Sequence, residues 1–204
     1  LLSSVASRRY WTHMGRFLIR PNIFVVLVGP PGDGKSSAMD VARKMCNKLN
    51  IPVCPNQATK EAITNTLGLE DSPWKLFTKN PEGKKEEARH LSIFANELSS
   101  FFGERDPKTM ADWLTDVWDR DNYEVITKNA GTDTIKNVCI VFGGCMTNKG
   151  LMNTFKDHLV SGGFARRTVF VRGGKDRTPV PLPEISQEQI TAGQNCLELC
   201  RRIL

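Results

Sequence analysis

Residues 23–37 read IFVVLVGPPGDGKSS, an apolar run that leads directly into a glycine-rich loop. The six residues 23–28 are apolar and partly β-branched, which is typical of a buried strand. The next eight match the pattern G-x-x-x-x-G-K-[ST] completely, and apolar residues then recur at helical spacing up to position 49. Strand, glycine loop and helix in this order predict a phosphate-binding loop.

The residue types of this loop suit a polyphosphate ligand. Backbone N–H groups at the start of a helix surround phosphates, and Gly32 and Gly34 let the backbone approach them. Lys35 places a positive charge at the β- and γ-phosphates, and the Ser36 hydroxyl completes the coordination of a Mg²⁺ held by those phosphates. We therefore expect ATP and Mg²⁺ as cofactors. The expected binding residues are Gly29, Pro30, Pro31, Gly32, Asp33, Gly34, Lys35, Ser36 and Ser37.

Composition excludes several classes of protein. With 204 residues and 40% hydrophobic content, the chain can bury a core as one domain, alone or with a small appendage, and is not disordered. No apolar run approaches the roughly 20 residues that span a bilayer, and no secretion signal opens the chain, so we expect a cytoplasmic protein without a membrane partner. The net charge of +6 favours an anionic partner such as nucleic acid. Because the chain opens on Leu1, we expect it to be a piece of a longer polypeptide.

The cysteine pattern argues against a structural metal. Six cysteines occur without a C-x-x-C pair and without histidines at zinc-site spacing. We therefore expect reduced, mostly buried thiols. They are Cys46, Cys54, Cys139, Cys145, Cys196 and Cys200.

The chain divides into three parts. Residues 1–20 place four arginines among aromatic and apolar residues, which predicts an amphipathic helix or linker, with its arginines in water or in contact with DNA or a neighbouring subunit. Residues 21–175 hold the P-loop core, in which the polar stretch 81–87 is expected to be a mobile surface loop. Residues 176–204 are expected to form a proline-rich linker and a helix that begins with a capping box at Ser186.

A second element of a nucleotide site follows a short predicted strand at residues 91–97. An ATPase needs a carboxylate at the end of a strand beside the phosphate loop, where it orients and polarises the attacking water. Glu97 is the candidate, and a surface or helix-capping glutamate is the alternative. The preceding position, where an aspartate usually steadies the metal, is Asn96, which can accept a hydrogen bond from a metal-bound water but adds no charge.

Four aspartates accompany a helix predicted to begin at Pro107. They invite the interpretation of a metal-dependent nuclease. The spacing of Asp112 and Asp116 instead favours the solvated face of an amphipathic helix, and no histidine or glutamate completes a metal site.

The next segment alternates like paired strands. Residues 123–136 have the pattern of a β-hairpin whose tip is flanked by lysines. A buried strand at 138–144 then leads to Thr147 and Asn148. Either residue could sense the γ-phosphate from a neighbouring strand, or the two could simply form a turn.

Arg166 and Arg167 follow a glycine pair and precede a strand expected at residues 168–171. A guanidinium at this point can neutralise charge that develops on the γ-phosphate of a nucleotide held by the next subunit. Surface arginines, or contacts to a DNA backbone, are the alternative.

The ordered motifs resemble those of AAA+ ATPases, in particular the helicase-like P-loop proteins of phages and mobile elements that accompany primases. The resemblance covers roughly residues 20–172 and is carried by PNIFVVLVGPPG at 21–32, FANEL at 94–98 and GGFARRTVFV at 162–171. It implies an α/β fold, a P-loop NTPase of AAA+-like type with three α/β/α layers. The implied sheet is mostly parallel, with a β-hairpin inserted before the sensor strand.

The last block is similar to the arginine-finger strand of superfamily 3 and minichromosome-maintenance helicases, where a Ser-Arg pair precedes the strand. Because Arg166 stands at the position of the serine, the resemblance favours Arg167 as the finger and keeps Arg166 as an alternate. In those families the hairpin before the sensor strand follows single-stranded DNA through a ring. Lys128 and Lys136 are therefore expected to hold phosphates.

The resemblance implies a ring-forming ATPase, expected as a hexamer, that drives DNA unwinding during replication of a phage or mobile element. Single-stranded or forked DNA is the expected partner, together with primase or other replication proteins. In this interpretation Glu97 activates water, Asn148 senses the nucleotide and Arg167 acts across the subunit interface. Two alternatives stay open: a loading or assembly factor that uses ATP without unwinding DNA, and a small-molecule kinase.

Overall fold

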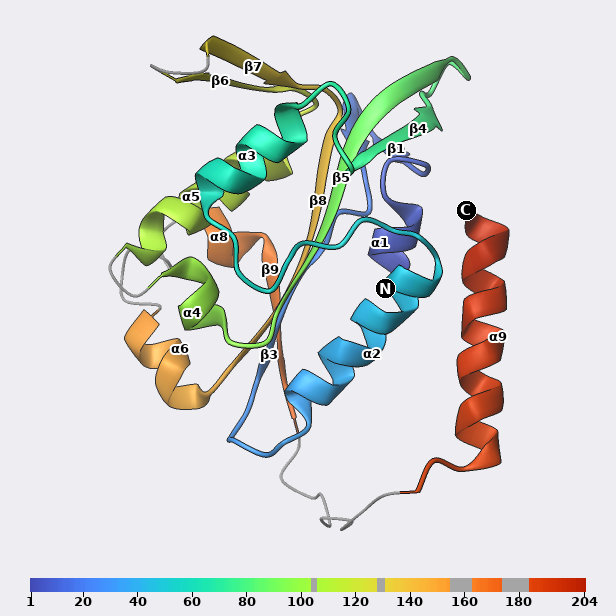
Figure 1. The fold of residues 1–204 in the computed structure, drawn as a ribbon, viewed down its shortest axis with the longest axis vertical. Coiled ribbons are helices and arrows are strands. Elements are labelled where there is room, and N and C mark those ends of the chain that lie inside the picture. Colours follow the sequence, from blue (N-terminus) through green and yellow to red (C-terminus); the bar gives the residue numbers. More distant parts are fainter. Residues whose placement is uncertain (104–105, 128–130, 155–162, 174–183) are drawn as a thin grey trace.

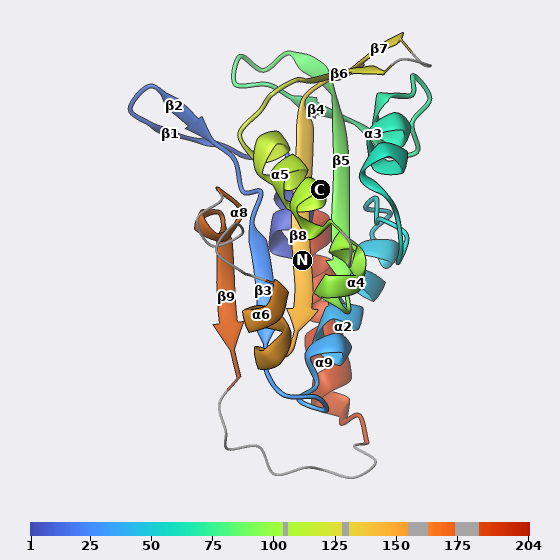
Figure 2. The same cartoon turned by 90° about the vertical axis from the view of Figure 1, so that its left-hand side faces the viewer.

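The computed structural model describes residues 1–103, 106–127, 131–154, 163–173 and 184–204. Five of its described strands form a mixed, mostly parallel sheet with helices on both faces, so the chain is an α/β protein (Figure 1, Figure 2). The order across the sheet is β4-β5-β8-β3-β9. These strands are β3 (Phe24–Val28), β4 (Lys75–Lys79), β5 (Lys85–Ala95), β8 (Val138–Met146) and β9 (Thr168–Arg172).

Within this five-stranded sheet the strands are parallel except for β4, which pairs antiparallel with β5 at one edge. The apolar run before the glycine loop is β3, as predicted. β8 is buried at all nine positions because it lies in the centre of the sheet, with both faces covered. β8 lies directly beside β3, and the strand that leads to Glu97 follows on the other side of β8.

Helices cover both faces of this sheet (Figure 1). On one side lie α1 (Leu2–Ala6), α2 (Lys35–Lys48) and α9 (Gln187–Ile203). On the other lie α3 (Lys60–Gly68), α4 (Leu98–Phe102), α5 (Pro107–Trp118), α6 (Asn148–Thr154) and α8 (Gly163–Arg166). The predicted helix start at Pro107 is confirmed, and so is the capping box of Ser186 with Gln189.

The larger core lies between the sheet and the second group of helices, and phenylalanine rings fill its centre. Phe142 of β8 contacts Phe24 of β3 with ring centroids 5.7 Å apart, and Phe102 of α4 contacts Phe164 of α8 at 5.3 Å. Each of the four residues is at most 4% exposed. Edge-to-face contacts add to the stabilisation from burial, so this cluster fixes α4 and α8 against β3 and β8.

Two glycines of β8 determine how closely helices approach the sheet. A Cβ atom on Gly143 would lie 2.7 Å from Met39 Sδ of α2, and one on Gly144 would lie 3.0 Å from Leu98 Cδ1 of α4. Successive residues of a strand point to opposite faces. The two glycines therefore let α2 and α4 pack directly on the same strand from opposite sides.

β9 forms the second edge of the sheet and is only partly covered. Val169, Phe170 and Val171 are between 40% and 54% exposed. Edge strands of natural proteins are commonly protected by a charge, a proline or a bulge, and in β9 the one charged residue, Arg172, stands at the end of the strand.

A hairpin precedes β8, as the sequence predicts. β6 (Tyr123–Thr127) pairs antiparallel with β7 (Gly131–Ile135), and the two form a separate two-stranded sheet. Figure 1 shows this hairpin at the end of the molecule that lies opposite the glycine loop. Lys128 lies outside the described residues, and Lys136 is exposed directly after β7.

The helix predicted over residues 1–20 is wrong beyond Ala6. α1 ends there, and β1 (Thr12–Met14) pairs with β2 (Phe17–Ile19) in a short hairpin around Gly15, whose φ is +60°. Glycine tolerates this left-handed backbone, which breaks a helix. The pattern of apolar residues was compatible with a helix, but α1 already ends where its C-cap residue Ser7 has a φ of +41°, and the turn at Gly15 then joins β1 to β2.

Arg8 does not point into water either. It is 3% exposed and donates to the carbonyl oxygens of Val138 (2.7 and 3.1 Å) and Arg120 (3.0 Å), and to the carboxylate of Asp121 (2.7 Å). These acceptors lie more than 110 residues away along the chain. Arg8 therefore attaches the N-terminal segment to the start of β8.

A buried polar chain makes the second attachment of this segment. Ser7 Oγ lies 2.7 Å from His90 Nδ1, and His90 Nε2 lies 3.0 Å from Ser92 Oγ. All three residues are fully buried. Burial, assisted by the charge of Arg9, lowers the pKa of His90 to about 3, so the imidazole is neutral.

The surface loop expected at residues 81–87 is also wrong in part. β4 and β5 form a hairpin, and residues 85–87 already belong to β5. The turn is organised by Asn80, whose Oδ1 accepts from the backbone N–H groups of Glu82 (3.1 Å) and Lys84 (2.9 Å). The charged residues misled the prediction because an edge hairpin can carry them on its solvent face.

The cysteine prediction is confirmed as far as burial is concerned. All six cysteines lie among the described residues, and each is an unpaired thiol. Five are buried, and Cys196 is half-buried.

Candidate nucleotide site

A cavity of about 420 Å³ opens where β3, β5 and β8 end. It is lined by the glycine loop and the start of α2, by Asn96 and Glu97 after β5, and by residues 145–147 at the end of β8. Parallel neighbouring strands end at the same edge of a sheet, which is why three segments distant in sequence meet here. The structure thus brings the two predicted site elements together.

The glycine loop has the backbone that the motif requires. Gly32 and Gly34 have φ angles of +79° and +72°, a region that favours glycine. Gly34 is the N-cap of α2 and has no side chain that could cap the first turn of the helix. The backbone N–H groups at the start of a helix favour binding of an anion.

Two further contacts shape the loop. Gly29 N–H donates to the Met146 carbonyl at 3.2 Å, which ties the start of the loop to β8. A Cβ atom on Gly29 would come within 2.5 Å of Asp33 Oδ2, and one on Gly173 within 2.8 Å. The Asp33 carboxylate therefore lies against two glycines, and larger side chains there would displace it.

Lys35 folds back onto its own loop. Its Nζ donates to the carbonyl oxygens of Gly29 (2.9 Å) and Pro30 (2.5 Å). Both acceptors are neutral, so a phosphate oxygen would form a stronger, charge-assisted hydrogen bond with the same ammonium group. The exposed hydroxyls of Ser36 and Ser37 lie beside it in the wall of the cavity.

Glu97 and Asn96 are both exposed at the cavity. The Ser99 hydroxyl donates to Glu97 Oε1 at 2.8 Å, so one carboxylate oxygen is oriented and the other lies outside this contact. Asn96 Nδ2 donates to Asp40 Oδ1 of α2 at 3.2 Å. Sequence reasoning missed Asp40, although it lies one helical turn after Ser36 and is therefore on the same side of α2.

The end of β8 contributes Thr147 but not Asn148. Thr147 lines the cavity, and its Oγ1 accepts from Gly150 N at 2.9 Å, which caps α6. Asn148 is the first residue of α6, is exposed and does not line the cavity. Cys145 also lines the cavity, and burial raises its pKa to about 11, so it is a neutral thiol rather than a nucleophile.

Arg166 and Arg167 lie far from this cavity. Thr168 pairs with Phe24 and Arg172 with Val28, so Arg167 stands at the opposite end of the sheet from the glycine loop of the same chain. At about 3.3 Å per residue, six strand positions separate them by roughly 20 Å. Arg166 is exposed.

Arg167 is held by its own chain. Its Nη1 donates to the Gly163 carbonyl at 3.1 Å, its Nη2 donates to Asp119, and its guanidinium lies 5.3 Å from the centre of the Trp118 ring. These contacts combine an ion pair with a cation–π contact. They fix the direction of a side chain that the sequence analysis assigned to a neighbouring subunit's nucleotide.

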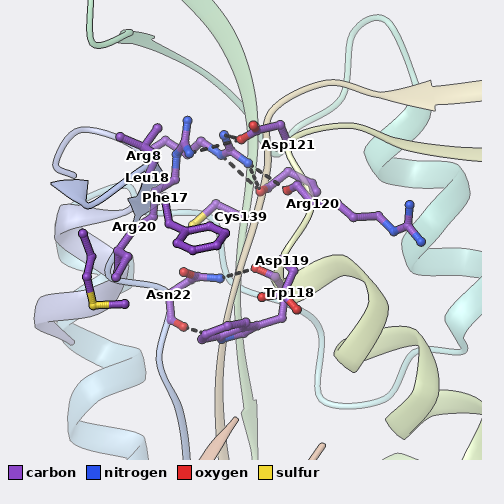
Figure 3. A pocket seen from close by; sticks show the side chains of 13 residues that line it. Arg8, Phe17, Leu18, Arg20, Asn22, Trp118, Asp119, Arg120, Asp121 and Cys139 are labelled. Atoms are coloured by element: carbon purple, nitrogen blue, oxygen red, sulfur yellow. Dashed lines mark hydrogen bonds and ion pairs between the residues drawn. The ribbon is translucent and has the colours of Figure 1, made fainter. Parts of the chain in front are cut away.

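A second cavity, of about 550 Å³, lies beside Trp118 and Asp119 at this end of the sheet (Figure 3). The β1–β2 hairpin, the end of α5 and the start of β8 line it. Asp121 accepts from Arg8 and lies 3.1 Å from Arg20. Burial opposes ionisation of Asp121, but the hydrogen bond from Arg8 and the charges of both arginines hold its pKa below its ordinary value.

The aspartates of α5 do not gather into a metal site. Asp112 pairs with Lys108 and Asp116 with Arg120, each one turn apart on the exposed face. Within the described residues, no group of three or more His, Cys, Asp or Glu side chains is arranged to hold a metal ion. The solvated-face interpretation is confirmed.

Comparison with known proteins adds nothing to this geometry. No family model matches the chain, and no curated protein matches it. In the described part of the chain, no helix combines the length and the apolar character that crossing a bilayer requires.

Proposed function

We propose that the chain is an ATP-hydrolysing P-loop domain of the AAA+ type, which assembles with further copies and acts as a motor on single-stranded or forked DNA. The observation that carries the proposal is the meeting of the glycine loop, Glu97 and Thr147 around one cavity. Three neighbouring parallel strands deliver these groups, and the strand between the other two is the predicted sensor strand. This arrangement suits a phosphate chain that is bound by the glycine loop and the start of α2 and is contacted by the residues that follow β5 and β8.

Binding begins with the loop. The ammonium of Lys35 exchanges its two backbone carbonyls for phosphate oxygens, and the N–H groups at the start of α2 point at the same phosphates. The residues present fit a phosphate-held Mg²⁺, because Mg²⁺ keeps most of its waters and needs few protein ligands. Ser36 would contact it and Asn96 would hold one of its waters, and the ion would neutralise charge on the transferred phosphoryl group.

Hydrolysis then depends on Glu97. The hydrogen bond from Ser99 to Oε1 fixes the direction of the carboxylate, and the second oxygen can accept the proton of an attacking water. Thr147 is better placed than Asn148 to contact the terminal phosphate, because Thr147 lines the cavity and Asn148 does not.

Assembly supplies what a single copy lacks. Because Arg167 lies roughly 20 Å from the glycine loop of its own chain, it can only act on a nucleotide bound by another copy. The exposed apolar residues of β9 lie at the sheet edge beside it and suit burial in a subunit contact. A closed ring repeats this contact at every interface.

Mixing two inactive variants tests the site and the assembly together. We expect Lys35→Ala and Arg167→Ala each to reduce ATP turnover at least roughly a hundredfold, because each removes a positive charge from the transition state. When the two are mixed, an interface with Lys35 from one variant and Arg167 from the other is intact, so turnover should partly return.

Two results would contradict this proposal. Full turnover by Lys35→Ala would overturn the nucleotide site, whereas absence of recovery in a confirmed mixed oligomer would overturn the role of Arg167 between subunits. Exposed Lys44→Ala on the same helix serves as the matched control and should not change turnover.

A loading or assembly factor would share the same ATP chemistry. Displacement of an annealed strand by the full chain distinguishes the two, since a loader binds and releases DNA without separating strands. Turnover stimulated by single-stranded DNA without any displacement would exclude the motor and leave the loader.

A further inference from the structure

A depression of about 430 Å³ lies at the edge of the sheet away from the nucleotide cavity. It is bordered by the β4–β5 hairpin, by Arg9 and Tyr10 after α1, and by the end of α9. We name the side chains that matter the Phe77 surface: Arg9, Tyr10, Phe77, Lys79 and Lys85.

Two aromatic side chains of this surface are unusually open. Phe77 is 56% exposed on β4, and Tyr10 is 49% exposed. The Tyr10 hydroxyl donates to the Ile203 carbonyl at 3.2 Å, which orients its ring. Burying such rings in the core would stabilise the fold, so their exposure suits a ligand with flat faces.

The charged side chains of this surface are all cationic. Lys79 stands opposite Lys85 in the β4–β5 pairing, and Lys85 Nζ lies 4.6 Å from the centre of the Phe77 ring. Among the described residues that line the depression, none is acidic. The nearby Glu87 is occupied by Lys75 at 3.1 Å and Arg89 at 2.5 Å.

Aromatic rings interleaved with cations are the chemistry of single-stranded nucleic acid binding. Bases stack on the rings regardless of sequence, and the cations neutralise the backbone. An acidic peptide would satisfy the cations but would leave the two exposed rings without a stacking partner. The combination therefore favours nucleic acid.

We propose that the Phe77 surface binds single-stranded nucleic acid, with bases stacked on Phe77 and Tyr10 and phosphates held by Lys79 and Lys85. The β4–β5 hairpin, which carries Phe77, Lys79 and Lys85, lies at the same end of the molecule as the β6–β7 hairpin, opposite the glycine loop (Figure 1). This inference rests on the proposed function in one respect, since the Phe77 surface would be a second contact for the DNA strand on which the proposed motor acts.

Fluorescence anisotropy without nucleotide tests the surface directly. The probes are a labelled 20-mer of oligothymidylate and a labelled abasic strand of the same length, which has the phosphates without the bases. We expect Phe77→Ala to weaken binding of oligothymidylate roughly tenfold and to leave the abasic strand nearly unchanged. Phe77→Trp should keep or strengthen binding of oligothymidylate, because its ring also stacks.

The lysines should behave differently. Lys79→Ala combined with Lys85→Ala should weaken both probes and reduce the slope of log K against log salt by about 1.4, two phosphates at about 0.7 each. The matched control is Phe17→Ala, because Phe17 is 58% exposed with Arg16 over its ring at 5.2 Å but lies outside this surface. It should change neither probe.

Two results would overturn the inference. One is oligothymidylate binding that Phe77→Ala leaves unchanged in a variant with the wild-type melting temperature, and the other is wild-type protein that binds neither probe. ATP turnover separates this outcome from failure of the proposed function. Phe77→Ala should keep its turnover without DNA, whereas Lys35→Ala should lose turnover and keep oligothymidylate binding.

Discussion

The two ends of the central sheet hold their polar and charged side chains in different ways. At the end where β3, β5 and β8 finish, Lys35, Asn96 and Glu97 line an open cavity, each with only one or two weakly competing partners. At the other end Arg8 is buried and bound by carbonyl oxygens and a carboxylate of its own chain. Loosely held groups can exchange their partners for a ligand, whereas saturated ones stabilise the fold.

Glu97→Gln tests the loosely held end and should have the largest effect. We expect turnover to fall by about two to three orders of magnitude while ATP binding persists, because the amide cannot accept the proton of the water. Single-turnover kinetics and nucleotide binding, measured on the same preparation, check this. Exposed Glu61→Gln is the control, and loss of both binding and turnover would instead indicate a structural role for Glu97.

Arg8→Ala tests the saturated end. It leaves the carbonyls of Val138 and Arg120 without their donor and detaches the N-terminal segment, so we expect a loss of about 2–3 kcal/mol in the free energy of unfolding. Urea unfolding measures it, with exposed Arg16→Ala as the comparison. A change below about 0.5 kcal/mol would show that the buried arginine does not anchor this segment.

The buried imidazole of His90 gives the same end a pH dependence. Between pH 6.5 and about 3 the unfolded chain binds a proton that the folded chain does not, so stability falls as pH falls. The contribution is about 1.4 kcal/mol per pH unit below 6.5. Unfolding curves at pH 7, 6 and 5 should be steeper in pH for the wild type than for His90→Gln, and parallel dependences would contradict the assignment.

Asp119→Asn tests how strongly Arg167 is held, and it should have the smallest effect on stability. Asp119 is half exposed, so its ion pair with Arg167 contributes less than about 1 kcal/mol to stability. Thermal unfolding should therefore change by only a few degrees. A larger loss would mean that Arg167 is as strongly built into the fold as Arg8.

Local patterns predicted the loosely held end well. The strand, glycine loop and helix of residues 23–49 follow from neighbouring residues alone, and Glu97 was identified from the strand before it. What the sequence did not reveal was the position of β8 between β3 and β5, because strand order depends on contacts between distant segments. The same contacts made Thr147 rather than Asn148 a lining residue.

The saturated end was predicted poorly for the same physical reason. The partners of Arg8 are residues 120, 121 and 138, and no residue near Arg8 in the sequence predicts these contacts. Charge also misled the interpretation of residues 81–87, because backbone pairing with β4 outweighs the local preference of charged residues for loops. Asp40 could have been found from its helical spacing after Ser36.

The bare backbone of Gly143 and Gly144 has a mechanical consequence. Because Met39 and Leu98 pack directly against β8, α2 and α4 lie close to the sheet, and α2 carries the glycine loop at its N-terminal end. A bulkier residue at either position would lift a helix off the sheet and tilt the loop at its end. Affinity would then suffer without any change in the residues that touch the ligand.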